Sequence, residues 1–107
     1  MDTDPIRHRA TLWLWSAEGK GSWHFVTIDG PAGEALSAAA LMHRLEFGKA
    51  RGFGSVKVTV TIGDTRWKTS AFPQKGKESW VLPVKKAVCR AEDIGEGDEV
   101  SLTLEPV

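Results

Sequence analysis

The chain is 107 residues long, 41% hydrophobic and 26% charged, and its 14 basic and 14 acidic side chains give no formal net charge. These values predict a single soluble domain over residues 1–107, with a flexible arm over residues 1–7. One cysteine, Cys89, excludes an intramolecular disulfide, and the lack of a signal-like start or of an apolar run near the roughly 20 residues of a membrane span favours the cytoplasm.

A β-hairpin is predicted near the start of the chain. Its first strand, residues 8–15, is apolar on both faces, because leucines alternate with tryptophans. A strand of this kind is normally covered on both sides. A polar loop over residues 16–22 then leads to the second strand, residues 23–28.

A helix is predicted over residues 32–47. The sequence Asp29-Gly30-Pro31 marks its start, since a proline at the first helical position loses no hydrogen bond. The segment is rich in alanine and leucine, which favour helix. We expect its apolar stripe to lie against one face of the sheet; the stripe consists of Ala38, Leu41, Met42 and Leu45.

A second hairpin gives the clearest signal in the chain. Valine or isoleucine alternates with lysine or threonine over residues 56–62, and Gly63-Asp64 forms a two-residue turn. That turn places Val60 opposite Trp67, and Val58 opposite Thr69, on the apolar face. The other face is predicted to carry Lys57, Arg66, Lys68 and Ser70.

The last part of the chain is predicted to form a strand, a short helix, a glycine turn and a strand, at residues 80–82, 85–90, 95–98 and 100–104. We expect Asp98 to order the turn by bonding its own backbone. Six strands are predicted in all, and closing them into a barrel would remove the exposed edges. The predicted fold class is all-β: a small closed six-stranded β-barrel with one packed α-helix and one short helix.

Three motifs occur in order along the chain: GFGSVKVTVTIGDTRWKTSAFP, WVLPVKKAV and IGEGDEVSLTL, with GSWHFVTI upstream. They resemble the bacterial family called domain of unknown function nineteen-oh-five, over about Ala10 to Glu105. The resemblance implies a small closed six-stranded barrel with a helix packed on it, and it implies no activity. Some members are fused to a bacteriocin-protection-type domain, which this sequence does not contain. Two positions differ from the family pattern: Cys89 replaces a basic residue, and Trp80 stands where tyrosine is frequent.

Charge is distributed unevenly. Residues 54–90 hold eight basic and two acidic side chains, whereas residues 91–107 hold six acidic and none basic. A basic hairpin beside an acidic final strand would neutralise itself locally; the alternative is a basic surface for an anionic partner. Nucleic acid is disfavoured as that partner, because the basic hairpin face lacks aromatic side chains for base stacking and the overall pI is near 6.8.

The sequence contains no catalytic or metal-binding pattern. The histidines and the cysteine are scattered, without the paired spacing of a metal site, so no metal and no cofactor is predicted. Ser70 lies within a strand instead of a nucleophile turn. Cys89 has basic neighbours that would make its thiol more reactive, yet on the short helix it is equally a small buried side chain. We therefore expect a protein that is not an enzyme.

Candidate ligand-binding residues lie within the motifs, where the fold alone does not demand their polar groups: Trp67, Lys68, Thr69, Ser70, Lys85 and Arg90. Thr69 is the most informative, because its hydroxyl falls among valines and a buried unbonded hydroxyl costs about 1–3 kcal/mol. A backbone carbonyl or trapped water would satisfy it, and so would a small anionic or polar ligand. We expect any pocket between the strand ending at Pro73 and the short helix, with Lys85 at its mouth.

The sequence therefore predicts a non-catalytic barrel that binds a small polar or anionic ligand or a protein partner. It is expected to act as a monomer or weak homodimer, away from membranes. The alternative is a nucleic-acid-associated barrel similar to the swapped-hairpin DNA-binding proteins, which share the order strand, Leu-Pro, short helix, Gly-Asp and strand.

Overall fold

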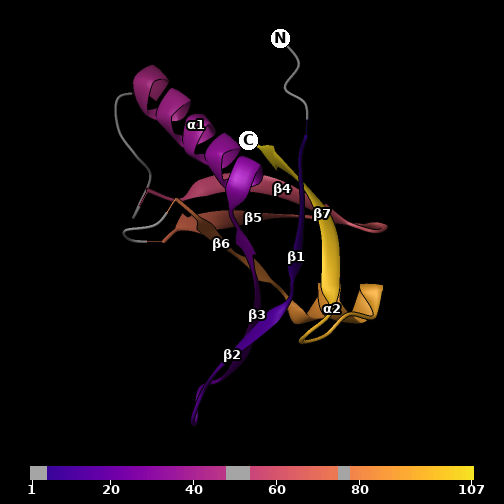
Figure 1. Ribbon diagram of the computed structural model, residues 1–107. Coiled ribbons are helices and arrows are strands. Elements are labelled where there is room, and N and C mark those ends of the chain that lie inside the picture. The colour runs from indigo at the N-terminus through magenta and orange to yellow at the C-terminus, as the bar shows by residue number, and fades with distance from the viewer. Residues whose placement is uncertain (1–4, 48–53, 75–77) are drawn as a thin grey trace.

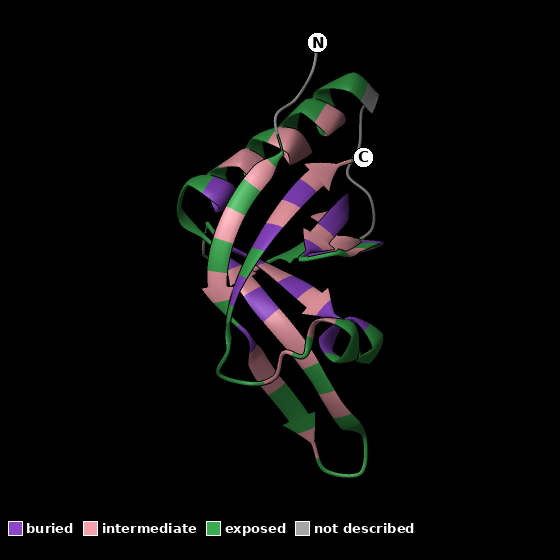
Figure 2. Ribbon diagram, turned by 90° about the vertical axis from the view of Figure 1, so that its right-hand side faces the viewer, coloured by how far each residue is buried: buried purple, intermediate pink, exposed green. Residues whose placement is uncertain are grey.

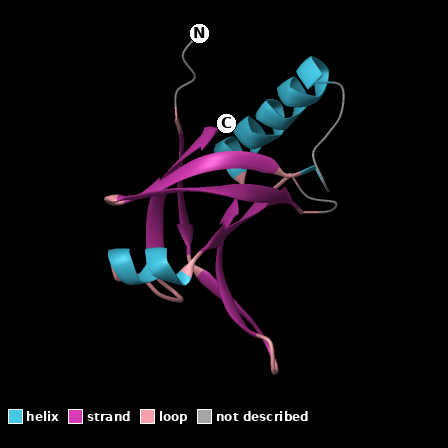
Figure 3. Cartoon of the chain, turned by 180° about the vertical axis from the view of Figure 1, so that it is seen from behind, coloured by secondary structure: helices cyan, strands magenta, loops and turns pink. Residues whose placement is uncertain are grey.

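The computed structural model describes residues 5–47, 54–74 and 78–107 (Figure 1). The chain is mostly β, with two helices and one curled antiparallel sheet (Figure 3). The strands are β1 (Ile6–Thr11), β2 (Trp13–Ala17), β3 (Gly21–Ile28), β4 (Val56–Ile62), β5 (Thr65–Pro73), β6 (Trp80–Val84) and β7 (Glu99–Pro106). The helices are α1 (Gly30–Phe47) and α2 (Lys86–Glu92), which lie at opposite ends of the molecule.

The sheet is a seven-stranded open half-barrel with the order β1-β7-β4-β5-β6-β3-β2. The prediction of a closed six-stranded barrel is therefore wrong. The extra strand arises because the single strand expected over residues 8–15 is two strands that pair with different partners, β1 with β7 and β2 with β3. β1 also begins within the arm expected to be flexible, since Ile6 pairs with Leu104 and Arg7 with Thr103.

Leu12 separates β1 from β2 and is completely buried. Its backbone N–H donates to the carbonyl of Asp98 at 2.8 Å, and its carbonyl accepts from the N–H of Gly97 at 2.8 Å. Both backbone groups of Leu12 are thus bonded to the glycine turn before β7. The chain changes direction here because this turn takes the place of a neighbouring strand.

The β4–β5 hairpin has the predicted register. Val60 lies opposite Trp67 and Val58 opposite Thr69, and both Val60 (0% exposed) and Trp67 (8%) are buried. The alternating side chains of β7 also face inward, as expected. The buried core thus formed, purple in Figure 2, has its largest fully buried side chains at Leu12, Val26, Ile28, Leu36, Val58, Val60, Leu82, Val84 and Leu104.

The predicted packing of α1 is wrong. The residues expected against the sheet are exposed on the far side: Leu41 (52% exposed), Met42 (63%) and Leu45 (72%). The contact is made instead by the first turns, where Ala32 and Leu36 are buried. The contact face continues along the helix, because Ala40 packs against the core and Ala40, His43 and Arg44 line a small pocket with β4 and the end of β7. The predicted stripe lies on the other side of the helix, whose C-terminal end extends beyond the sheet (Figure 1).

α1 is fixed at its base by two close contacts. A Cβ on Gly33 would lie 2.9 Å from the carbonyl oxygen of Glu78 and 3.0 Å from that of Ile28, so only glycine allows this approach. The indole N–H of Trp80 donates to the Ser37 hydroxyl at 3.1 Å. These contacts fix the orientation of α1 relative to the sheet.

The last part of the chain follows its prediction closely. α2 forms over residues 86–92 and buries Val88 and Cys89. In the turn that follows, the Asp98 carboxylate accepts the Gly95 N–H at 2.8 Å, and the Asp98 N–H donates to the Gly95 carbonyl at 3.0 Å. The expected self-bonding of this turn is confirmed.

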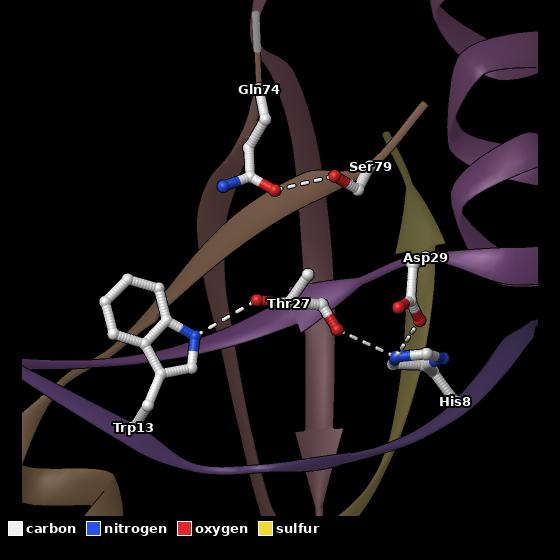
Figure 4. A network of polar contacts seen from close by, with 6 residues as sticks. All are labelled: His8, Trp13, Thr27, Asp29, Gln74 and Ser79. Atoms are coloured by element: carbon white, nitrogen blue, oxygen red, sulfur yellow. Dashed lines mark hydrogen bonds and ion pairs between the residues drawn. The ribbon is translucent and has the colours of Figure 1, made fainter. Parts of the chain in front are cut away.

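The edge strand β1 passes beside β3, where side chains connect them (Figure 4). Nε2 of His8 lies 2.8 Å from the carbonyl oxygen of Thr27 and 3.7 Å from a carboxylate oxygen of Asp29. From β2, the indole N–H of Trp13 donates to the Thr27 hydroxyl at 3.1 Å. Thr27 is therefore the point at which both halves of the bent strand are tied to β3.

The acidic final strand does lie beside the basic hairpin. β7 is the sheet neighbour of β4, and an ion pair of 3.5 Å joins Arg66 of β5 to Glu105 of β7. On the other side of β7, Arg9 pairs with Glu99 at 2.6 Å. Local neutralisation thus accounts for part of the charge asymmetry, while Lys57 and Lys68 stay exposed on the outer face.

Candidate functional site

The sheet opens where β6 ends, because β6 is shorter than the strands on either side. It pairs with β3 over His24–Ile28 and, within the described residues, with β5 only at Phe72 and Pro73. β5 and β6 are held together at that end, where the Ser79 hydroxyl donates to the side-chain oxygen of Gln74 at 2.6 Å (Figure 4). At the other end the chain leaves β6 for α2 while β3 and β5 run on.

A hollow of about 460 Å³ lies in this break. Its lining comprises residues 20–24, Thr69 and residues 83–86, and we call it the β3–β5 hollow. Because the sheet is interrupted here, residues from both of its faces contribute to the lining. His24 pairs with buried Val84 and belongs to the core face. Trp23 belongs to the opposite face. The volume falls in the range of about 300–1,000 Å³ usual for small-molecule sites.

The hollow is positively charged. Lys20 comes from the β2–β3 turn, and Lys85 and Lys86 from the start of α2. None of the described lining residues is acidic, and among the described residues none of these three lysines forms an ion pair. Their charges are therefore available to an anion that enters the hollow.

Two buried nitrogen atoms near this end of the half-barrel have no hydrogen-bond partner among the described residues: Nδ1 of His24 and Nε1 of Trp67. His24 lines the hollow, and Trp67 lies on β5 two residues before Thr69, on the same strand face. An unsatisfied buried polar group costs about 1–3 kcal/mol. His24 thus contributes to the lining, while its unpartnered Nδ1 is itself buried beneath that surface.

Aromatic side chains cover the outer face of the β2–β3 hairpin. Trp13 stacks on Phe25 with ring centroids 4.9 Å apart, and Trp15 lies across from Trp23 at 5.3 Å. The second pair is near the hairpin tip, which extends beyond the body of the protein and is exposed (Figure 2). Trp15 and Trp23 keep 48% and 45% of their surface exposed, and Trp23 also lines the hollow.

The structure brings only some of the predicted site residues together. Thr69 and Lys85 both line the β3–β5 hollow. Lys68 and Ser70 line a neighbouring surface hollow of about 350 Å³, which also includes Thr69. Trp67 belongs to the core, and Arg90 is exposed on α2 and lines neither hollow.

The fully buried hydroxyl expected at Thr69 is not found. Thr69 is half-buried between two hollows, and the unpartnered buried atoms belong to Trp67 and His24 instead. The sequence-based interpretation missed Lys20, Trp23, His24 and Lys86 as lining residues. Two signals were present: a lysine inside a glycine-rich turn, and a tryptophan next to it that faces away from the core.

Cys89 lies inside α2 and is buried. Its Sγ is 4.0 Å from the carbonyl oxygen of Val84, and burial raises the pKa of the thiol above its ordinary value of 9.0. The basic neighbours in the sequence therefore do not activate it. Among the described residues, no three histidine, cysteine or acidic side chains lie close enough to hold a metal ion.

The described helices include no segment that could cross a lipid bilayer. No curated protein matches the sequence. The family described as Domain of unknown function (DUF1905) matches residues 8–104, which is nearly the whole chain. The chain belongs to this family.

Proposed function

We propose that this protein is a non-catalytic module that binds a small anionic molecule in the β3–β5 hollow. The observation that carries the proposal is the convergence of Lys20, Lys85 and Lys86 on a hollow without an acidic lining residue. Three cations around one space repel each other, and an anion would relieve that repulsion. The hollow is open to solvent and large enough for a metabolite of ordinary size.

Neutral groups in the lining give the proposed site hydrogen-bonding capacity. Nδ1 of His24 is buried and unpartnered, so a ligand atom would reach it only after the imidazole turned toward the hollow, and that contact would restore a hydrogen bond lost on folding. The Thr69 hydroxyl and the Ser22 hydroxyl lie in the same lining. Depending on its tautomer, the histidine would accept a hydrogen bond from the ligand or donate one to it.

The test is a thermal-shift screen of small anions at about 1 mM, including phosphate, pyrophosphate, citrate and nucleoside monophosphates. A ligand that binds only the folded state stabilises it by RT ln(1 + [L]/Kd) and so raises the melting temperature. Calorimetry on each hit should then give affinities about tenfold weaker for Lys85→Ala, because a charge-assisted hydrogen bond is lost. Raising the salt concentration should also weaken binding.

The matched control is Arg90→Ala. Arg90 is an exposed cation on the same helix as Lys86, but it does not line the hollow. Arg90 lies one helical turn after Lys86 but outside the lining, so its removal takes away only a solvent-screened attraction and should leave the affinity of every hit within about twofold of wild type. Equal weakening by Arg90→Ala and Lys85→Ala would contradict the proposed site, as would a screen without hits.

A nucleic-acid-associated role is the second candidate, and one observation favours it. Trp15 and Trp23 are exposed on the hairpin whose turn carries Lys20. These two rings supply the aromatic faces that the β4–β5 hairpin lacks. Single-strand binders combine such stacking faces with cationic grooves. Binding to single-stranded DNA that falls steeply as salt is raised from about 50 to 200 mM would support this role over the first.

A further inference from the structure

Trp23 has two structural roles that are usually separate. It forms a cross-strand pair with Trp15, which stabilises the β2–β3 hairpin, and it also lines the β3–β5 hollow. The ladder between β3 and β6 begins at His24, so Trp23 lies just past the last paired residue, at the rim of the break. Trp23 borders the hollow and keeps 45% of its surface exposed, although Trp15 of β2 lies against it.

We infer that the ligand of the β3–β5 hollow carries a flat ring next to its anionic group, and that the ring stacks on Trp23. This inference rests on the proposed function and adds the chemical class of the ligand. The lysines at positions 20, 85 and 86 supply the charge, and Trp23 supplies the largest aromatic ring in the described lining, which also includes the imidazole of His24. Aryl phosphates, aryl carboxylates and nucleoside monophosphates have this combination of groups.

The orientation of the ligand follows from where these groups lie. Lys85 and Lys86 stand where β6 passes into α2, whereas Trp23 and Lys20 belong to the hairpin side of the hollow. A ligand with its ring on Trp23 can therefore direct its anionic group across the break, toward the start of α2. A tryptophan face accepts any flat π system, so stacking selects for a ring without selecting a particular base.

The experiment separates the ring from the charge with matched probes. AMP, ribose 5-phosphate and adenosine are titrated calorimetrically into wild-type protein, and phenyl phosphate is compared with inorganic phosphate. We expect AMP to bind about tenfold more tightly than ribose 5-phosphate, in line with the effect of one stacking face. Adenosine, which lacks the anionic group, should bind more weakly than AMP.

Two variants assign that gain to Trp23. Trp23→Ala should reduce AMP affinity to that of ribose 5-phosphate, whereas Trp23→Phe should retain part of the gain. Phe72→Ala, which removes an exposed aromatic ring outside the hollow, is the control and should leave AMP binding unchanged. Circular dichroism of each variant establishes that the hairpin is folded before binding is compared.

The possible failures are distinguishable. If each ring probe binds no better than its ring-free partner while the anions still bind, the stacking inference is wrong and the proposed function stands. If neither phosphate nor any phosphate ester binds, the proposed function fails and the inference fails with it. If an oligothymidylate of about 12 nucleotides binds far more tightly than AMP, the surface recognises single-stranded nucleic acid instead of a small molecule.

Discussion

Thr65 and Glu92 are joined across the end of the half-barrel: the threonine hydroxyl donates a hydrogen bond of 2.5 Å to Oε2 of the glutamate. Glu92 is the last residue of α2, and Thr65 begins β5 directly after the Gly63-Asp64 turn. The carboxylate also occupies the space that a Cβ on Gly63 would need. Gly63 has a φ of +58°, so both its conformation and its surroundings favour glycine.

The first prediction concerns this contact. Gly63→Ala should lower the free energy of unfolding by about 1–2 kcal/mol, since it adds left-handed strain and a collision with Glu92. Glu92→Ala should cost about 1–2 kcal/mol through loss of the bond to Thr65. In the double variant the collision is absent, so its cost should be smaller than the sum of the costs of the two single variants. Strictly additive costs in urea denaturation would show that the two positions do not interact.

A second prediction concerns the indole of Trp67. Trp67→Ala should cost about 3–5 kcal/mol, because it leaves a cavity against Val60. Trp67→Phe should cost less than about 1.5 kcal/mol, since the buried Nε1 forms no hydrogen bond within the described residues that the change could break. Chemical denaturation provides both values. A cost well above about 1.5 kcal/mol for Trp67→Phe would indicate that Nε1 has a partner after all.

A third prediction compares the two sides of α1. Leu36→Ala should cost about 2–5 kcal/mol, because Leu36 is fully buried. Leu45→Ala should change stability by less than about 0.5 kcal/mol, because Leu45 is 72% exposed. The two substitutions remove the same atoms, so the difference in their midpoints reports burial alone. Similar losses for both would mean that Leu45 is covered in solution.

A fourth prediction concerns the thiol of Cys89. Because burial raises its pKa, the thiol should react with a disulfide reagent at pH 8 much more slowly in the native protein than in the urea-unfolded chain. The folded state keeps the neutral thiol at a pH where the unfolded thiol ionises. The free energy of unfolding should therefore fall as the pH rises past the ordinary thiol value of 9.0. Equal native and unfolded rates at pH 8 would contradict this account.

The β4–β5 hairpin could be predicted from sequence to the residue, because its register depends on one turn and one alternating pattern, both local. The break at Leu12 could not, since the local pattern runs through it without interruption. What interrupts the strand is a pair of backbone hydrogen bonds to Gly97 and Asp98. These partners are more than 80 positions away in the sequence. A periodicity argument uses only neighbouring residues and therefore does not include them.

α1 shows a different limit of sequence reasoning. The periodicity allowed more than one apolar stripe, and the larger side chains of Leu41 and Leu45 were assigned to the core. The structure buries Ala32 and Leu36 instead, because the close approach at Gly33 fixes the base of the helix. Small residues suit a close approach, and the larger ones are left on the helix face that is turned away from the core.

The candidate site was predictable only in part. Thr69 and Lys85 were selected because their polarity had no role in the fold, and both line the β3–β5 hollow. Lys20, Trp23 and His24 were missed because the hollow depends on where β6 stops relative to its two neighbours. That difference in strand length is a property of the assembled sheet, and no single motif encodes it.

The pairing of β1 with β7 has a consequence for the order of folding. Ile6 and Leu104 are partners although 98 positions separate them, so the first strand has no ladder until the last one has been synthesised. A long loop must close before this pairing contributes any stability, which slows folding. During translation, the alternating face of β1 remains open while the β4–β5 hairpin can already form. During synthesis, β1 is therefore among the last of the described strands to find a partner.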